Sequence, residues 1–254
     1  MMQMSRAWLS KTAGEFGLAR FTPPTFRDIC WSVLPWERLD DATAPDGVRL
    51  ELRRRGEELL ILAGGYDLMS SEDEATSRAL ADLTLDGLGS SSARVLVGGL
   101  GMGFTLRAAL DRVGAGGCVE IAELVPAVVE WNRGPLAELA ARPLEDPRTT
   151  LVVGDVAETI RNAEGRYDAI LLDVDNGPIA LAHQKNSALY GERGLSRARR
   201  ALRPGGRLGV WSLSDDAAFT KRLGRVGFNA RAHRVEASRK GRGRKHVVWV
   251  AERR

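Results

Sequence analysis

The sequence predicts an α/β fold in which helices cover both faces of a doubly wound, mostly parallel sheet of about seven strands. From residue 93 onward, short apolar runs alternate with segments of helical periodicity. This alternation is typical of βαβ units, whose right-handed crossovers place successive strands in one parallel sheet. The runs containing Val97, Leu171 and Val210 are almost continuously apolar, as expected for strands with helices on both faces.

The order of the expected elements follows from these runs. Five strands are expected over 93–99, 117–124, 148–155, 167–175 and 207–213. Helices are expected over 104–114, 125–139, 156–163, 186–202 and 215–227. Two extended segments, 228–238 and 245–252, close the chain and bring the expected sheet to seven strands.

A small β region precedes the large sheet. Val48, Leu50 and Leu52 alternate with more polar residues, which predicts a β-hairpin with one buried face and a turn at Gly56. A helix is expected over 70–85, because acidic residues in its first turn are followed by apolar residues at helical spacing.

The first part of the chain has a different character. Its first 45 or so residues lack clear periodicity and carry three tryptophans, Trp8, Trp31 and Trp36. We therefore expect two domains: an N-terminal arm with the small β region over 1–69, and a catalytic domain over 70–254. An apolar arm of this kind favours pairing with a second copy, so we expect a homodimer.

Composition narrows the class of protein. The hydrophobic content of 44%, with 28% charged residues, is ordinary for a globular enzyme. We expect no membrane span, because no apolar run reaches about 18 residues. The N-terminus lacks the pattern of a secretory signal, which predicts a cytoplasmic protein. Cys30 and Cys118 fit neither a disulfide framework nor zinc spacing, so no metal is expected.

Positive charge gathers near the C-terminus. The net charge is +4, and seven arginines and lysines lie within residues 231–245. Such a segment attracts phosphate groups. No aromatic side chains interleave with these charges as a nucleic-acid stacking surface requires, which favours a solvated hairpin turn over a nucleic-acid site.

A glycine-rich turn follows the first strand of the expected large sheet, where open α/β sheets bind ligands. Its glycines are Gly98, Gly99, Gly101 and Gly103. Glycines permit a tight turn and let a ligand approach bare backbone, although a plain structural turn has the same residues. Phe104 stands where a dinucleotide-binding loop needs a further glycine, which disfavours a Rossmann dehydrogenase.

Acidic residues follow the next strands. Glu120 comes near the end of the second strand, where a carboxylate can accept hydrogen bonds from both ribose hydroxyls. Asp155 ends the third strand, where it can accept a hydrogen bond from an adenine amine or simply cap the following helix. Glycine turn and acids together, in this order, predict a nucleoside site.

The fourth strand ends in a polar loop with two carboxylates and an amide. Asp173, Asp175 and Asn176 precede a Gly-Pro turn and form the candidate catalytic set. A carboxylate here can hold an ammonium, neutralise a sulfonium or act as a general base. The loop could also be a charged turn in which the backbone satisfies Asp173.

These segments resemble those of the spermidine synthase branch of the class I methyltransferase-fold enzymes, over roughly residues 45–254. The resemblance implies a Rossmann-like methyltransferase sheet and an S-adenosylmethionine-type donor. It implies that Glu120 holds the ribose, Asp155 the adenine amine, and that Asp173 is the main catalytic carboxylate and also lies at the donor. The four glycines then contact the donor.

The chain departs from this family where the acceptor should bind. The family's second loop aspartate falls at Asn176, and its Tyr-His-Glu motif matches Thr76-Ser77-Arg78, with Asp67 in place of an upstream glutamine. A cation at Arg78 would repel a polyamine. We therefore expect putrescine to be rejected in favour of a neutral or anionic small molecule.

Three functions remain open. The first is methyl transfer from S-adenosylmethionine to a small acceptor that is not a polyamine. The second is aminopropyl transfer from decarboxylated S-adenosylmethionine, as in polyamine aminopropyltransferases. The third is a non-catalytic nucleoside-binding relative. His183 or Tyr190 could assist deprotonation, although a surface position for the one and a packed position for the other are ordinary alternatives.

Overall fold

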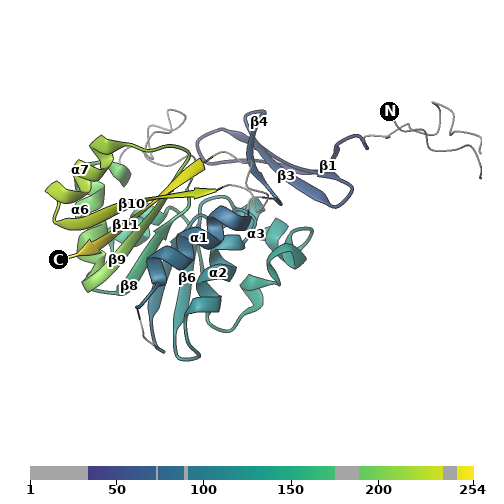
Figure 1. The fold of residues 1–254 in the computed structure, drawn as a ribbon. Helices are drawn as coiled ribbons and strands as arrows, with labels where there is room; N and C mark the ends of the chain where they lie inside the picture. Colours follow the sequence, from purple (N-terminus) through teal and green to yellow (C-terminus); the bar gives the residue numbers. More distant parts are fainter. Residues whose placement is uncertain (1–33, 73, 89–90, 175–188, 237–244) are drawn as a thin grey trace, which may run out of the picture. The chain divides into compact units, whose positions relative to one another are not determined.

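The computed structural model describes residues 34–72, 74–88, 91–174, 189–236 and 245–254, which form two sheets (Figure 1). The smaller sheet is antiparallel, in the order β1-β2-β3-β4. Its strands are β1 (Glu37–Thr43), β2 (Arg49–Arg55), β3 (Glu58–Ala63) and β4 (Tyr66–Ser70). The expected hairpin is β2–β3, with Leu52 paired to Ile61, and a further strand lies on each side of it.

The larger sheet has the seven strands that the sequence predicts. They are β5 (Arg94–Gly98), β6 (Cys118–Glu123), β7 (Thr149–Val153), β8 (Tyr167–Leu172), β9 (Leu202–Ser212), β10 (Phe228–Glu236) and β11 (Lys245–Arg253). Their order is β10-β11-β9-β8-β5-β6-β7. The strands β5 to β9 are parallel, and β11 inserts antiparallel between β9 and β10.

The strand order reverses between β5 and β8. From β5 the chain moves outward through β6 and β7, then returns to add β8 and β9 on the other side of β5. Ligands of such sheets bind beyond the carboxyl ends of the strands at this reversal.

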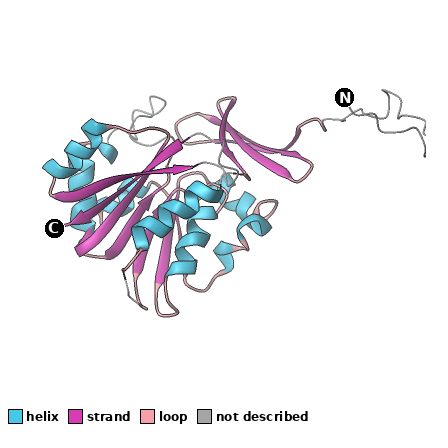
Figure 2. Cartoon of the chain, in the orientation of Figure 1, coloured by secondary structure: helices cyan, strands magenta, loops and turns pink. Residues whose placement is uncertain are grey.

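Helices cover both faces of the large sheet (Figure 2). They are α1 (Glu74–Leu85), α2 (Phe104–Arg112), α3 (Pro126–Arg133), α4 (Val156–Arg161), α6 (Glu192–Ala201) and α7 (Ala217–Arg225). Val95 and Val97 of β5 pack in the core under α1 to α3, whereas Leu96 packs in the core under α4, α6 and α7. Because successive strand residues point to opposite faces, one apolar strand supplies both cores.

Several boundaries differ from the expected ones. The helix expected over 125–139 is α3, which ends at Arg133. The helix expected over 70–85 begins at Glu74, because the residues before it form β4. The strand expected over 207–213 begins earlier, because β9 starts at Leu202 and includes Pro204; its pairing with β8 shifts register between Tyr167 and Ala169. Both sheets lie within one compact unit, Pro35–Arg254. The expected domain boundary after residue 69 stays a prediction.

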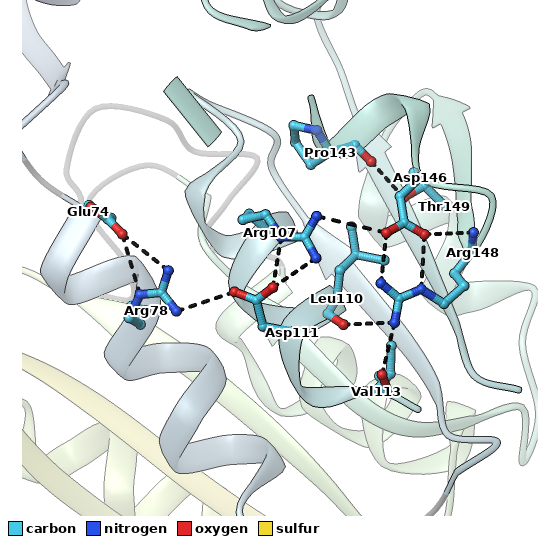
Figure 3. Close-up of polar contacts among 10 residues, drawn as sticks. All are labelled: Glu74, Arg78, Arg107, Leu110, Asp111, Val113, Pro143, Asp146, Arg148 and Thr149. Carbon is cyan, nitrogen blue, oxygen red and sulfur yellow. Dashed lines mark hydrogen bonds and ion pairs between the residues drawn. The ribbon is translucent and has the colours of Figure 1, made fainter. Parts of the chain in front are cut away.

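A chain of ion pairs runs over the outer surface of α1 and α2 (Figure 3). Arg78 of α1 contacts Glu74 at 3.2 Å and Asp111 of α2 at 3.4 Å. Asp111 also contacts Arg107 at 2.8 Å, and Arg107 reaches Asp146 at 3.8 Å. These contacts tie the two helices together and tie α2 to the segment before β7.

The last ion pair of this series, between Arg148 and Asp146, is less exposed to water than the pairs at Arg78. Arg148 pairs with Asp146 at 2.7 Å and donates hydrogen bonds at 2.9 Å to the carbonyl oxygens of Leu110 and Val113, at the end of α2. These contacts satisfy carbonyl groups that a helix end leaves open. The hydrogen bond from Arg148 lowers the pKa of Asp146 to about 2.

We expect Asp146→Asn to lower the free energy of unfolding by about 1 to 2 kcal/mol near neutral pH. The folded-state pKa of Asp146 lies below its ordinary value of 3.8, so its contribution is complete above that value and is lost as pH falls through about 2. Urea unfolding of both proteins should show the difference shrinking between about pH 4 and about pH 2. Glu130→Gln, at an exposed pair with Arg133, is the control and should change stability by less than about 0.5 kcal/mol. A difference in the free energy of unfolding that does not change with pH would contradict the role of the lowered pKa of Asp146.

Candidate functional site

A cavity of about 570 Å³ lies at the carboxyl ends of the parallel strands. Residues that follow β5, β6, β7 and β8 line it, together with residues of α1, β9 and β11. The small sheet supplies further lining residues, among them Asp46 and Asp67. Both sheets therefore contribute to one site at the reversal of strand order.

The glycine turn brings bare backbone to this cavity. Gly99 and Gly101 line it, and both have a positive φ, +87° and +51°. A Cβ at Gly99 would come within 2.4 Å of the carbonyl oxygen of Asp173. Of the four expected glycines, Gly98 and Gly103 are not among the lining residues; Gly98 packs against Val156 instead.

The structure does not bring Glu120 to the cavity. Glu120 lies within β6, three residues before the strand ends, and its carboxylate pairs with Arg166 at 2.5 Å. Glu123 is the last residue of β6 and lines the cavity. In a regular strand, residues three apart point to opposite faces, so the two carboxylates cannot share one site. Glu123, and not Glu120, is therefore the carboxylate of β6 that lines the cavity, and the residue that binds the ribose stays a prediction.

Glu123 is held by the turns on both sides of it. Its Oε2 accepts a hydrogen bond from the backbone N–H of Leu100 at 2.8 Å, and its Oε1 accepts one from Val125 at 2.8 Å. Its exposed fraction is 7%. Each carboxylate oxygen has two lone pairs, so these bonds orient the group and leave acceptor capacity for a ligand. The glycine turn and Glu123 thus form one preorganised unit.

Asp155 both caps a helix and lines the cavity. It caps α4, because its Oδ1 accepts a hydrogen bond from the N–H of Ala157 at 2.8 Å. It also lines the cavity together with Val156. Capping and ligand contact, which the sequence left as alternatives, are both compatible with this position.

Asp173 follows β8 directly and lines the cavity. Its backbone N–H donates to the carbonyl oxygen of Gly98 at 2.9 Å. Its Oδ2 accepts hydrogen bonds from the hydroxyls of Thr105 and, at 3.4 Å, Ser77. The carboxylate is therefore satisfied by side-chain hydroxyls of α1 and α2, which the sequence did not indicate.

The segment Thr76-Ser77-Arg78 splits in space. Thr76 and Ser77 line the cavity and are 4% and 3% exposed. Arg78 is not among the lining residues and turns to Glu74 and Asp111 on the outer surface (Figure 3). Adjacent helical residues are separated by about 100° around the axis, which accounts for the split. The expected repulsion of a polyamine by Arg78 is therefore wrong.

The cavity is acidic although the chain as a whole is basic. Five carboxylates line it, belonging to Asp46, Asp67, Glu123, Asp155 and Asp173. His246 also lines it, and no arginine or lysine does so within the described part of the chain. Such a lining attracts cations and repels a ligand carboxylate.

An aromatic pair lines the cavity on the opposite side of Asp173 from Glu123. Trp211 of β9 and His246 of β11 stack edge to face, with ring centroids 4.9 Å apart. The sheet order β6-β5-β8-β9-β11 places Asp173 between the acidic strand ends and this pair. Sequence reasoning missed both residues, because no spacing relates positions on β9 and β11 that antiparallel pairing brings together.

Some expected residues cannot be placed. Asp175, Asn176 and His183 lie outside the described residues. Tyr190 is 2% exposed, stacks on Phe219 and donates to the carbonyl oxygen of Val174 at 3.4 Å, so it packs in the core.

Within the described ranges, no group of three metal-ligating side chains could hold a metal ion. Of the described helices, none is both long and apolar enough to cross a membrane.

Comparison with known proteins shows sequence similarity to polyamine enzymes. The chain is 34% identical over 150 residues to spermine synthase of Arabidopsis thaliana, covering 59% of this chain and 40% of that relative. It is 31% identical over 157 residues to polyamine aminopropyltransferase of Mycobacterium tuberculosis, covering 60% and 28%. It is 39% identical over 114 residues to putrescine N-methyltransferase 4 of Nicotiana tabacum, covering 44% and 28%. The chain thus spans less than half of each relative. No family model matches.

Solved structures show the same fold. Spermidine synthase from Thermotoga maritima superimposes with a TM-score of 0.70 at 17% identity, over 91% of this chain and 85% of that one. A probable spermidine synthase from Corynebacterium glutamicum gives 0.58 at 16% identity, over 85% and 79%. The solved structures show a Rossmann-like, methyltransferase-type fold. Within that class, the comparisons confirm the expected resemblance to the spermidine synthase-like family.

The comparisons overturn one expectation. Methyl transfer to an acceptor that is not a polyamine is contradicted, because the matched relatives are named as polyamine aminopropyltransferases, spermine and spermidine synthases, or putrescine methyltransferases. The cavity gives the physical reason. Arg78, which was expected to repel a polyamine, lies elsewhere, whereas the residues that line the cavity are acidic. Asn176, where the family has a second aspartate, lies outside the described residues.

Proposed function

We propose that the chain transfers an aminopropyl group from decarboxylated S-adenosylmethionine to an amine of the polyamine class. The observation that carries this proposal is the acidic cavity, with five carboxylates and no described arginine or lysine. Donor and acceptor both carry positive charge in this reaction, and a carboxylate-lined site lowers the free energy of binding both.

The donor's nucleoside lies over β5, β6 and β7 in this proposal. Asp155 accepts the adenine amine, and Glu123 accepts the ribose hydroxyls. Gly99 and Gly101 allow the donor to approach the backbone of the turn. Val156 and Val174, which also line the cavity, supply apolar contact for the base.

The lining also bears on which donor is used. Intact S-adenosylmethionine ends in a carboxylate, which a cationic side chain usually holds. Among the described residues the cavity offers carboxylates instead. An intact donor would place like charges together, so the decarboxylated donor fits better.

Asp173 lies where the reaction takes place. The amine nitrogen attacks the aminopropyl carbon bonded to the sulfonium; the new C–N bond forms as the C–S bond breaks, and methylthioadenosine leaves. The attacking nitrogen then loses its proton. Asp173 orients the amine and accepts that proton directly or through water. Trp211 and His246 line the acceptor half, where an aromatic face can contact an alkylammonium group.

Three further properties belong to the proposal. The acceptor is a small molecule rather than nucleic acid, the protein acts in the cytoplasm, and it forms a homodimer. The three tryptophans of the first 45 or so residues motivate the homodimer, and light scattering can test it.

The test is a transfer assay with purified protein. Decarboxylated donor is supplied with putrescine, with spermidine, or with a neutral alcohol of similar length, and products are identified by mass spectrometry. We expect aminopropylated amine and methylthioadenosine in equal amounts from at least one amine, and none from the alcohol. Absence of aminopropyl transfer to both amines, in protein that binds methylthioadenosine, would contradict the proposal.

A further inference from the structure

We propose that two buried hydroxyls, those of Thr105 and Ser77, position the carboxylate of Asp173 for reaction; this inference rests on the proposed function. Thr105 is the second residue of α2, and its Oγ1 donates to Asp173 Oδ2. Ser77 lies on α1 and donates to the same oxygen at 3.4 Å. Both are positioning residues, because they act through Asp173.

Fixing one oxygen of a carboxylate fixes the other, because the group is planar. Two hydroxyls from two helices hold Oδ2 from different directions, which restricts rotation of the Asp173 side chain. A carboxylate held in this way presents its second oxygen in one direction, as transfer between two bound ligands requires.

The main chain of Asp173 is fixed as well. Its N–H donates to Gly98 at 2.9 Å, and its carbonyl oxygen lies so near Gly99 that no side chain could be accommodated there. With the backbone anchored by β5, the remaining freedom of Asp173 is in its side chain. The two hydroxyls remove that freedom.

The helices that carry the hydroxyls are joined on their outer surface. Arg78, the neighbour of Ser77, contacts Asp111 of α2 at 3.4 Å (Figure 3), and Asp82 contacts Arg112 at 2.8 Å. Ser77 therefore faces the cavity while the next residue bridges to α2. These ion pairs join the two helices whose hydroxyls meet one carboxylate oxygen.

The burial of Thr105 indicates that its hydroxyl serves to hydrogen-bond Asp173. The residue is 2% exposed, and Asp173 is its hydrogen-bond acceptor. Burying a hydroxyl lowers stability unless it is hydrogen-bonded, and valine would fill the same volume without that cost.

Thr105→Val removes the hydroxyl and keeps the shape of the side chain. We expect kcat to fall about tenfold or more, while the Kd for methylthioadenosine stays within about twofold. Thr105→Ser should restore kcat to within about threefold of the wild type, because it returns the donor. Unchanged kcat in Thr105→Val, or failure of Thr105→Ser to restore it, would overturn the proposal.

A double-mutant cycle separates positioning from a structural effect. In an Asp173→Asn background, Thr105→Val should change the remaining kcat by less than about twofold, because the group it positions is already altered. An equal loss in both backgrounds would show that Thr105 supports the fold and not Asp173.

Failure of the proposed function can be told apart from failure of this inference. If the wild type transfers nothing, calorimetry of putrescine binding to the protein loaded with methylthioadenosine replaces kcat. Weaker binding in Thr105→Val with recovery in Thr105→Ser would support positioning. Equal affinities in all three proteins, or no putrescine binding by the wild type, would overturn it.

Discussion

Replacing Asp173 by asparagine is expected to lower kcat about a hundredfold to a thousandfold. Asparagine keeps the shape of the side chain and can still accept hydrogen bonds from Ser77 and Thr105. It cannot accept a proton from the amine or balance the charge of the sulfonium. Steady-state kinetics with decarboxylated donor and putrescine measure the effect, and the Kd for methylthioadenosine should change little.

A control for this variant lies on the same strand. Asp168 is at the opposite end of β8, where it pairs with Arg203 at 2.8 Å and accepts the N–H of Arg94 at 2.7 Å. Asp168→Asn should lower the melting temperature but leave kcat within about threefold. If both variants lost activity equally, general loss of structure would explain the result. A kcat within about threefold of the wild type in Asp173→Asn would contradict its proposed role.

The second large effect is expected at Glu123. Glu123→Gln should weaken methylthioadenosine binding about tenfold to a hundredfold, because charge-assisted hydrogen bonds to both ribose hydroxyls are weakened. The amide also puts an N–H group against one of the two backbone donors, from Leu100 or Val125, and disturbs the glycine turn. Calorimetric titration measures the affinity.

Glu120→Gln is the matched control. Glu120 and Glu123 lie on one strand, are both 7% exposed and receive the same change of side chain. Because Glu120 pairs with Arg166 away from the cavity, Glu120→Gln should lower stability and leave the Kd within about twofold. If Glu120→Gln weakened methylthioadenosine binding and Glu123→Gln did not, the ribose would lie at Glu120, and the proposed role of Glu123 would be contradicted.

The large sheet could be predicted because its signal is local. Runs such as 95–97 and 169–172 are apolar throughout, and helices of regular periodicity separate them. The small sheet was predicted only in part. β1 carries few apolar residues and is largely exposed, and β4 is short and runs into the start of α1, so neither shows the alternation that β2 shows. Edge strands of this kind are fixed by tertiary pairing.

The site was predictable where it depends on strand ends. Asp155 comes two residues after β7, Asp173 comes directly after β8, and both line the cavity. Glu120 was chosen in place of Glu123 although the expected strand, 117–124, includes both. Glu120 lies three residues before the end of β6, and an odd number of residues along a strand moves a side chain to the other face. Pro126 opens α3, and Glu123 is the last acidic residue before it. The position of this proline would therefore have indicated Glu123 as the carboxylate at the strand end.

No pattern in the sequence indicated which segments far apart in the chain contact one another. Arg78 was expected at the acceptor because it matches the glutamate of the family's Tyr-His-Glu motif. It contacts Glu74 and also Asp111, which lies 33 residues further along. The pairing of Trp211 with His246 depends likewise on the insertion of β11 beside β9. Such contacts follow from packing rather than from local pattern.

Donor competition tests the central claim most directly. Equal concentrations of decarboxylated and intact S-adenosylmethionine are mixed with putrescine and the wild-type protein, with Asp173→Asn as the control, and the products are quantified. An acidic cavity predicts spermidine in at least about tenfold excess over N-methylputrescine. N-methylputrescine as the main product would contradict the account, because it would require the cavity to accept the donor that carries a carboxylate.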